Sequence, residues 1–276
     1  MNRSPAASAL ALVRPRNLLM AAAGVAVGGV LALGRLALPA ALLWAMGSAL
    51  GLGAAGNAAN DLFDVEADRI NQPLRPLAAG ELSRREAMVI AGVAGGLGLW
   101  AAWWVSPALF GLGVLALAAM LAYSPLFKAR GVWGNVTVAV VASLPLVYGA
   151  TAVGDWRAGV VPAVLAAFLH LAREVVKDLE DVPGDLAIGR RTLPIELGPD
   201  AGFLAAAATL AMFVPVAVIP WAAGWYGRRY GVVVIALDIG ILVLISRLAR
   251  RRLAGARGAL KAAMLAGLVA LLWDRL

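Results

Sequence analysis

Residues 38–68, LPAALLWAMGSALGLGAAGNAANDLFDVEAD, change character after Ala59. The first part has no charged side chain and is long enough for a membrane-spanning helix, which needs about 20 mostly apolar residues. Beyond it, Asp61, Asp64 and Asp68 follow at spacings that bring them to one face if the helix continues. The stretch therefore predicts a helix that crosses a membrane and ends in an acidic face at the membrane surface.

Apolar stretches of this kind recur along the chain, and they predict an all-α polytopic membrane protein with nine transmembrane helices. Of the 276 residues, 62% are hydrophobic and only 14% are charged, against about 25% charged in soluble domains. The stretches are too long for the strands of a transmembrane barrel. No hydrophilic block is long enough for a second domain, so residues 1–276 are expected to form one domain. The predicted spans are 18–34, 38–59, 86–105, 107–127, 134–154, 158–172, 201–224, 230–246 and 258–273.

The net charge of +8 follows from where the basic residues lie, without a nucleic-acid partner. If the N-terminus is cytoplasmic, 19 of the 24 Lys and Arg residues fall in cytoplasmic segments, as the positive-inside rule describes. The five exceptions are Arg35, Arg157, Arg228, Arg229 and Arg275. We therefore expect an integral protein of the cell inner or plasma membrane, with its acidic segments facing the cytoplasm.

Two acidic segments repeat the same spacing. In both, the offsets are 0, 4, 7 and 11, which place each set on one helical face. Each set also begins where an apolar span ends, so its first members lie near the membrane surface. We call the sets the first acidic ladder (Asn57, Asp61, Asp64 and Asp68) and the second acidic ladder (Glu174, Asp178, Asp181 and Asp185).

Stacked carboxylates repel one another, and a divalent cation resolves the conflict. Mg²⁺ prefers oxygen ligands and commonly bridges a few carboxylates to substrate phosphates. Ordinary loop acids, balanced by nearby Arg and Lys, would account for one ladder but hardly for two in register at the same membrane face. The chain has no cysteine and a single histidine, which excludes thiolate sites and makes a histidine-based zinc site improbable. The ladders therefore predict a site for Mg²⁺ and a diphosphate.

Basic residues at the same face complete this predicted site. Arg75 follows the first ladder in a proline-containing turn, Lys128 follows Tyr123-Ser124-Pro125, and Arg190 and Arg191 follow the second ladder. Their side chains, with that of Lys177, are expected to bind diphosphate oxygens.

The motifs resemble those of the UbiA superfamily of intramembrane prenyltransferases. Residues 60–71, running on to Arg75-Pro76, resemble its first Asp-rich motif, and residues 173–185 resemble its second. Tyr123-Ser124 and Asn135 are similar to its middle region. The resemblance implies a nine-helix bundle around an apolar cavity, with caps over a cytoplasmic mouth. It also implies Mg²⁺-dependent transfer of a prenyl group from a prenyl diphosphate to a lipophilic acceptor.

The resemblance further suggests a branch of the superfamily and roles for individual residues. Residues 173–181 followed by 189–194 are most similar to the branch that transfers geranylgeranyl to geranylgeranylglyceryl phosphate in ether-lipid synthesis. An aromatic quinone precursor or a chlorophyllide is the alternative acceptor. On this hypothesis the six aspartates hold one or two Mg²⁺ ions, Arg75 and Lys128 draw away the leaving group, and Tyr123 positions that group or shields the cation. Asn57 or Asn60 binds metal or a diphosphate oxygen.

Proteins of other classes fit the pattern less well. A membrane transporter has many spans too, but its ion sites usually lie near mid-membrane on broken helices, whereas these acids lie at one surface beside Arg and Lys. The compact signature of CDP-alcohol phosphotransferases is absent.

Three lesser features also give expectations. His170 is expected to be packed and hydrogen-bonded, and Asp238 to make a structural hydrogen bond or line a cavity. The pairs Gly24 with Gly28 and Gly92 with Gly96 are expected at close helix contacts.

Overall fold

A computed structural model describes residues 3–127, 131–187 and 189–275, and in these ranges every regular element is helical. A π-helical turn, Tyr123–Phe127, follows α5, and a 3₁₀ turn, Trp156–Gly159, leads into α7. The helices are α1 (Pro5–Val13), α2 (Pro15–Leu33), α3 (Ala40–Asn71), α4 (Arg84–Trp103), α5 (Pro107–Ala122), α6 (Val132–Ala152), α7 (Val160–Ala187), α8 (Leu193–Glu196), α9 (Pro199–Ala222), α10 (Arg228–Ala249) and α11 (Ala256–Arg275).

Local sequence explains where the two site-bearing helices begin and end. Helix α3 starts after Pro39, whose backbone is extended, and runs for 32 residues through the first acidic ladder. It ends where the Gln72 N–H donates to the Asp68 carbonyl, at 2.8 Å, because Pro73 cannot continue the helical hydrogen bonds. Helix α7 runs for 28 residues through the second ladder, with Pro183 inside its last turns. Each ladder is thus carried by one continuous helix, as its spacing predicts.

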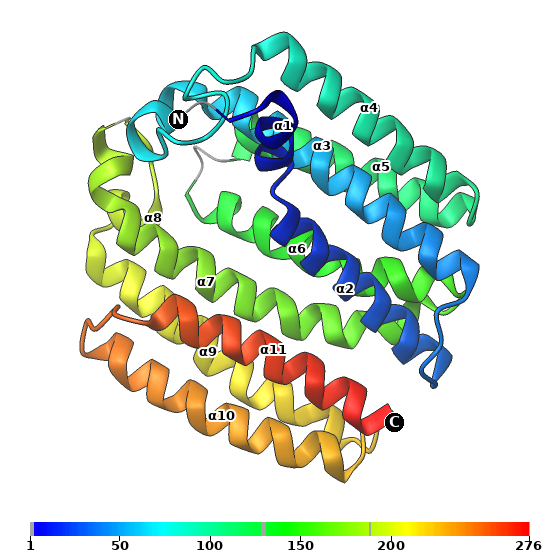
Figure 1. The fold of residues 1–276 in the computed structure, drawn as a ribbon. Coiled ribbons are helices and arrows are strands. Elements are labelled where there is room, and N and C mark those ends of the chain that lie inside the picture. Colours follow the sequence, from blue (N-terminus) through cyan, green and yellow to red (C-terminus); the bar gives the residue numbers. More distant parts are fainter. Residues whose placement is uncertain (1–2, 128–130, 188, 276) are drawn as a thin grey trace.

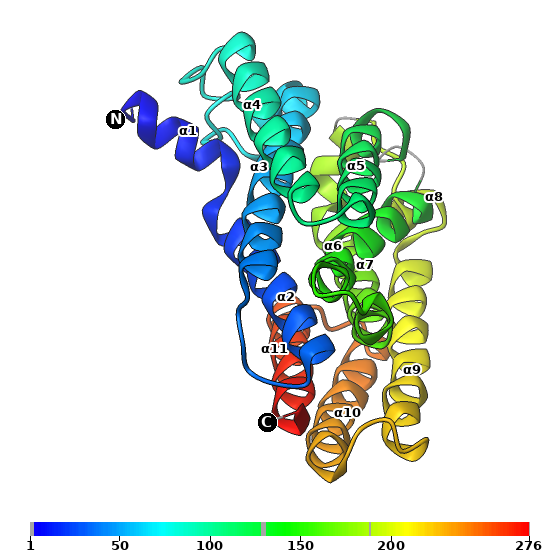
Figure 2. The same cartoon turned by 90° about the vertical axis from the view of Figure 1, so that its right-hand side faces the viewer.

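The helices pack in two groups joined through the middle of the molecule (Figure 1). One apolar core joins helices α2 to α6, and a larger one joins α7, α9, α10 and α11 with parts of α2 and α6. Helices α2, α6, α7 and α11 contact one another in a closed ring, and Figure 2 shows α2 and α11 on the same side of the molecule. This arrangement leaves an interior that is lined from both groups.

Glycines allow α2 and α6 to approach closely. A Cβ at Gly28 would lie 1.9 Å from the Leu146 carbonyl oxygen, and one at Gly149 would lie 1.8 Å from the Val25 carbonyl oxygen. The expected contact at Gly24 and Gly28 is therefore confirmed. The expected contact at Gly92 and Gly96 is wrong, because no atom of another helix in the described ranges lies within 4 Å of a Cβ at either position. That face of α4 packs against no neighbouring helix.

Eight helices of the described ranges are long and apolar enough to cross a membrane. Helix α3 is not among them, because small and polar residues such as Ser48 and Asn57 lower the hydropathy of its apolar half. The expectation of an all-α membrane bundle is confirmed, and the ninth span stays a prediction. The eight are Pro15–Leu33, Arg84–Trp103, Pro107–Phe127, Val132–Ala152, Trp156–Ala187, Pro199–Ala222, Arg228–Ala249 and Ala256–Arg275.

Helix α1 is attached to the segment between α3 and α4. Its Leu12 packs with Leu77 and Leu82 of that segment in a small apolar core. The carboxylate of Glu81 accepts hydrogen bonds from the Ser8 hydroxyl at 2.9 Å and from Arg3 at 3.0 Å. The Ser8 hydrogen bond and the neighbouring Arg3 guanidinium lower the pKa of Glu81.

Acidification is expected to loosen α1. Because the folded structure lowers the pKa of Glu81, the stabilisation is complete above its ordinary value of 4.5 and is lost as the pH falls through the lowered value. Hydrogen exchange of α1 amides, corrected for intrinsic rates, measures this loss. The native protein should approach the exchange of the Glu81→Gln variant at acid pH, and equal protection in both proteins at neutral pH would contradict the assignment.

Candidate active site

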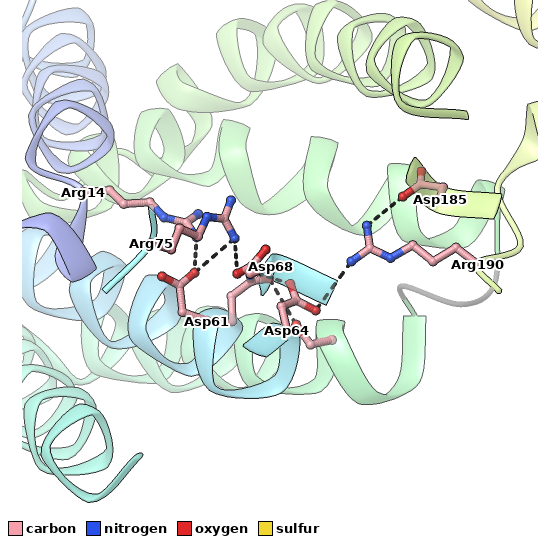
Figure 3. Close-up of polar contacts among 9 residues, drawn as sticks. Arg14, Asp61, Asp64, Asp68, Arg75, Asp185 and Arg190 are labelled. Carbon is pink, nitrogen blue, oxygen red and sulfur yellow. Dashed lines mark hydrogen bonds and ion pairs between the residues drawn. The ribbon is translucent and has the colours of Figure 1, made fainter. Parts of the chain in front are cut away.

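The three aspartates of the first ladder lie buried on one face of α3. Asp61, Asp64 and Asp68 expose only 1%, 7% and 5% of their surface. Arg75 donates to Asp68 at 2.6 Å and to Asp61 at 3.4 Å, and Arg14 forms an ion pair with Asp61 (Figure 3). Buried carboxylates are costly unless they are paired, and here arginines from other parts of the chain supply the charge.

Arg190 brings the two ladders together. It contacts Asp185 of the second ladder at 2.9 Å and Asp64 of the first ladder at 3.7 Å, and Figure 3 shows its guanidinium between the two carboxylates. Asp185 lies near the end of α7 and is itself buried. The predicted meeting of the ladders at one site is therefore present in the fold, with an arginine between them.

The other members of the second ladder have different surroundings. Asp178 accepts a hydrogen bond from the Asn135 amide of α6 at 2.8 Å. Asp181 is half-buried. Glu174 is buried, and it pairs with Arg173 at 2.6 Å and with Lys177 at 3.5 Å. The ladder thus provides aspartates near the first ladder, whereas its glutamate is neutralised by basic residues of its own helix.

The predicted polar residues around the ladders are only partly brought together. Asn60 donates to Asp64 at 2.9 Å and accepts from the Ser124 hydroxyl at 3.1 Å, which connects α3 to the π-helical turn. Asn57 donates instead to the Val13 carbonyl at 2.8 Å. Arg191 is exposed, and Lys128 lies outside the described residues. Tyr123 begins the π-helical turn after α5 and lines the cavity together with Asn57 and Asn60.

A cavity of about 790 Å³ extends from this region into the bundle. Asn57, Asn60 and Tyr123 line one end, and most of the remaining wall is apolar, with side chains from α2, α6, α7, α10 and α11. His170 lines this cavity and makes no hydrogen bond with any described residue, so the expectation of a hydrogen-bonded histidine is wrong. Asp238 does not line it; this carboxyl is buried within α10, and its Oδ1 atom has no hydrogen-bond partner in the described ranges.

The donor set suits Mg²⁺ bound together with a phosphate group. Within the described ranges, no three acidic or imidazole side chains are arranged as a closed metal cage. Mg²⁺ does not need such a cage, because it usually takes one or two carboxylates and completes its shell with water and substrate phosphates. The buried aspartates, which arginines neutralise in this structure, are carboxylates that would fit such a site.

The contacts of two basic residues at this site are not predicted from the sequence, and only one of the two, Arg190, is expected there to bind diphosphate. Arg14 pairs with Asp61 across 47 residues of chain. The sequence predicts Arg190 as one of several diphosphate donors that follow the second ladder, and not as the residue that connects the two ladders. For Arg14 the only signal in the sequence is its place at the predicted cytoplasmic face. Which carboxylate each one contacts depends on helix packing, and local spacing does not encode it.

These features define a helical membrane protein that can hold an anionic head group among carboxylates and arginines and an apolar chain in the adjoining cavity. The UbiA prenyltransferase family model matches residues 18–269, and the chain belongs to this family. It is therefore a membrane prenyltransferase, as the sequence motifs predict.

Similar proteins agree with this membership. A digeranylgeranylglyceryl phosphate synthase of Halobacterium salinarum (strain ATCC 29341 / DSM 671 / R1) is 37% identical over 241 residues, covering 87% of this chain and 86% of that protein. The synthase of the same name from Natronomonas pharaonis is 36% identical over 270 residues, covering 96% and 95%.

Solved structures share the fold. One, from a study of the biosynthesis of digeranylgeranylglyceryl phosphate synthase in membranes, has a TM-score of 0.85 at 24% identity and covers 98% of both chains. A UbiA homolog from Archaeoglobus fulgidus bound to GPP and Mg²⁺ has a TM-score of 0.74 at 21% identity, covering 96% of this chain and 99% of that chain.

Proposed function

We propose that this prenyltransferase transfers a geranylgeranyl group from geranylgeranyl diphosphate to geranylgeranylglyceryl phosphate, in the synthesis of ether lipids. The observation that carries the proposal is the meeting of the two acidic ladders, through Arg190, beside the polar end of an apolar cavity. The names of relatives that are 36–37% identical along most of the chain support the choice of acceptor.

The six aspartates of the two ladders are the proposed Mg²⁺ ligands. They offer only oxygen donors, and the aspartates of the first ladder are already buried together on one helix face. Mg²⁺, when bound, supplies positive charge that stabilises the diphosphate as the allylic C–O bond breaks. The ligands are Asp61, Asp64, Asp68, Asp178, Asp181 and Asp185.

The arginines of the site change partners in this proposal. Arg75 and Arg190 now donate to the same carboxylates that would bind the cation. If those carboxylates held the cation, the guanidinium groups of Arg75 and Arg190 would be free to donate to the diphosphate and would stabilise the charge of the leaving group. Lys128, Lys177 and Arg191 are proposed to add further donors.

The cavity wall and its polar end have separate roles. The apolar wall receives the isoprenoid chain and excludes water, which protects an allylic carbocation from hydrolysis. Tyr123 lines the cavity near the ladders, and Asn60 is hydrogen-bonded to Asp64. We assign to these two side chains the orientation of the reacting end of the substrate, while Asn57 adds a second amide there.

The proposed topology has nine spans, with α3 as the ninth. The apolar half of α3 is long enough to cross the membrane, and α4 packs along it. The excess of Lys and Arg near the ladders supports a cytoplasmic N-terminus and a cytoplasmic active site. In this proposed topology, residues 1–276 form a single membrane domain.

The proposal is tested by prenyl transfer with purified protein, radiolabelled geranylgeranyl diphosphate and geranylgeranylglyceryl phosphate, with and without Mg²⁺. A diether product that requires Mg²⁺ is expected. If product formed only with an aromatic quinone precursor or a chlorophyllide, the proposed acceptor would be wrong, but the reaction would still be a prenyl transfer. No transfer to any acceptor by folded protein would contradict the reaction and favour a membrane transporter.

The Arg190→Gln variant is expected to raise KM for geranylgeranyl diphosphate by about 10-fold, because one charged hydrogen-bond donor to the diphosphate is lost. The matched control is Arg251→Gln, since Arg251 is exposed and its one ion-pair partner among the described residues is the exposed Asp200. Initial rates over a range of diphosphate concentrations measure the effect. Equal KM values in the two variants would show that Arg190 does not bind the diphosphate.

A further inference from the structure

A second group of basic residues lines the cavity, distinct from the arginines that pair with the ladder aspartates. Arg16 comes from the first turn of α2, Arg173 from α7 and Lys261 from α11. Three helices far apart in sequence thus turn cationic side chains toward one cavity whose wall is otherwise mainly apolar. The α2 and α11 helices that carry two of these residues are in contact with each other.

The charges of this basic group are not balanced within the protein. Arg173 pairs with Glu174, but Lys177 shares that carboxylate. Arg16 and Lys261 have no ion pair or hydrogen bond with any residue that the structure describes. Arg16 and Lys261 are exposed and Arg173 is half-buried, so an anion that enters the cavity can reach all three side chains. An anionic ligand would balance the excess charge.

The prenyl diphosphate does not account for this excess. Its proposed site is formed by Arg75, Arg190 and the ladder aspartates, whereas none of the three basic residues contacts an aspartate of either ladder. These residues therefore suit a second anion whose own apolar chain enters the same cavity. A prenylated glycerophosphate has both parts.

We propose that Arg16, Arg173 and Lys261 bind the phosphate of the glycerophosphate acceptor. This inference rests on the proposed function and adds to it the subsite that recognises the acceptor head group. Asn57, Asn60 and Tyr123, to which we assign the orientation of the reacting end of the prenyl donor, line the same cavity. A glycerol hydroxyl attached to a phosphate held at this subsite therefore shares the chamber with that reacting end. His170 lies on the same wall and offers a further donor.

The test uses the full-length protein in phosphatidylcholine vesicles, in which the acceptor is the only phosphomonoester lipid. Arg16→Gln and Lys261→Gln are each expected to raise KM for geranylgeranylglyceryl phosphate about 10-fold, and the double variant about 100-fold, because each removes one charge-assisted contact. The KM for geranylgeranyl diphosphate should stay unchanged, which also shows that the variants fold. Lys261→Arg should restore most of the acceptor affinity.

A neutral acceptor and a control variant make the result specific. With geranylgeranylglycerol, which lacks the phosphate, the native protein and both variants are expected to have the same kinetics. Arg252→Gln, at an exposed position between α10 and α11 that does not line the cavity, should behave as the native protein does with both acceptors.

Each remaining outcome would overturn the subsite. If both variants kept the native KM for geranylgeranylglyceryl phosphate, Arg16 and Lys261 would not contact its phosphate. The proposed function would still stand. A rise in KM for the diphosphate alone would assign the basic residues to that substrate. If phosphatidylglycerol in the vesicles raised the acceptor KM of the native protein but not of the variants, the subsite would belong to a membrane lipid. If the native protein used no glycerophosphate acceptor at all, the proposed function itself would fail, and that failure is visible without any variant.

Discussion

The Asp64→Asn variant is expected to lower kcat by about 100- to 1000-fold, because it removes a negative charge at the point where the two ladders meet. Asp64 is buried, accepts from Asn60 and contacts Arg190. The amide keeps the size of the side chain but is a poor ligand for Mg²⁺. Initial rates at saturating geranylgeranyl diphosphate, measured over a range of Mg²⁺ concentrations, give both kcat and the Mg²⁺ requirement.

The control for this variant lies on the same helix. Glu66 is exposed and pairs with Arg69 of the next turn, so Glu66→Gln removes a carboxylate from α3 without changing the ladder face. Its kcat should stay within about 2-fold of the native value, because surface ion pairs contribute little. If Asp64→Asn kept native kcat and native Mg²⁺ dependence, the first ladder would not be the metal site.

The Gly149→Ala variant is expected to lose most of its folded protein, with destabilisation of about 3 kcal/mol or more. The added Cβ would lie 1.8 Å from the carbonyl oxygen of Val25, a backbone atom that cannot move without separating α2 from α6. These two helices belong to the ring around the cavity, so the change should also reduce transfer by the protein that remains. The yield of monodisperse protein and its Tm in detergent measure the effect.

Gly96→Ala is the matched control for this substitution. Gly96 lies in the middle of α4, and among the described residues no atom of a neighbouring helix lies within 4 Å of a Cβ at this position. Alanine favours the helix over glycine by up to about 1 kcal/mol, so the control should be as stable as the native protein or slightly more so. Equal yields of Gly149→Ala and Gly96→Ala would show that the α2–α6 contact is looser than the structure has it.

The sequence predicts those parts of the fold that depend on local pattern. Charge-free stretches of about 20 residues indicate helices in a membrane, and the spacing of the aspartates indicates that α3 and α7 continue beyond their apolar parts. The same reasoning failed at Gly92 and Gly96. Their spacing equals that of Gly24 and Gly28, but spacing does not reveal which helix faces have a neighbour.

The site is predicted less completely than the fold. The aspartates follow from a periodic pattern, whereas the roles of Arg14 and Arg190 depend on which helices are adjacent. The same is true of Arg16 and Lys261, which the positive-inside rule explains as orientation signals. Their place on the cavity wall is a property of the packed bundle, and only the folded chain separates them from the other basic residues of that face.

The most direct test of the central claim is to locate the metal. Crystals grown with Mn²⁺ in place of Mg²⁺, together with an unreactive thio analogue of geranylgeranyl diphosphate, give an anomalous signal at the metal position. The signal is expected between α3 and α7, within ligand distance of Asp64 or Asp61 and of an aspartate of the second ladder, with Arg75 and Arg190 turned toward the diphosphate. A signal without any carboxylate of α3 among the ligands, or diphosphate bound away from the ladders, would contradict the account.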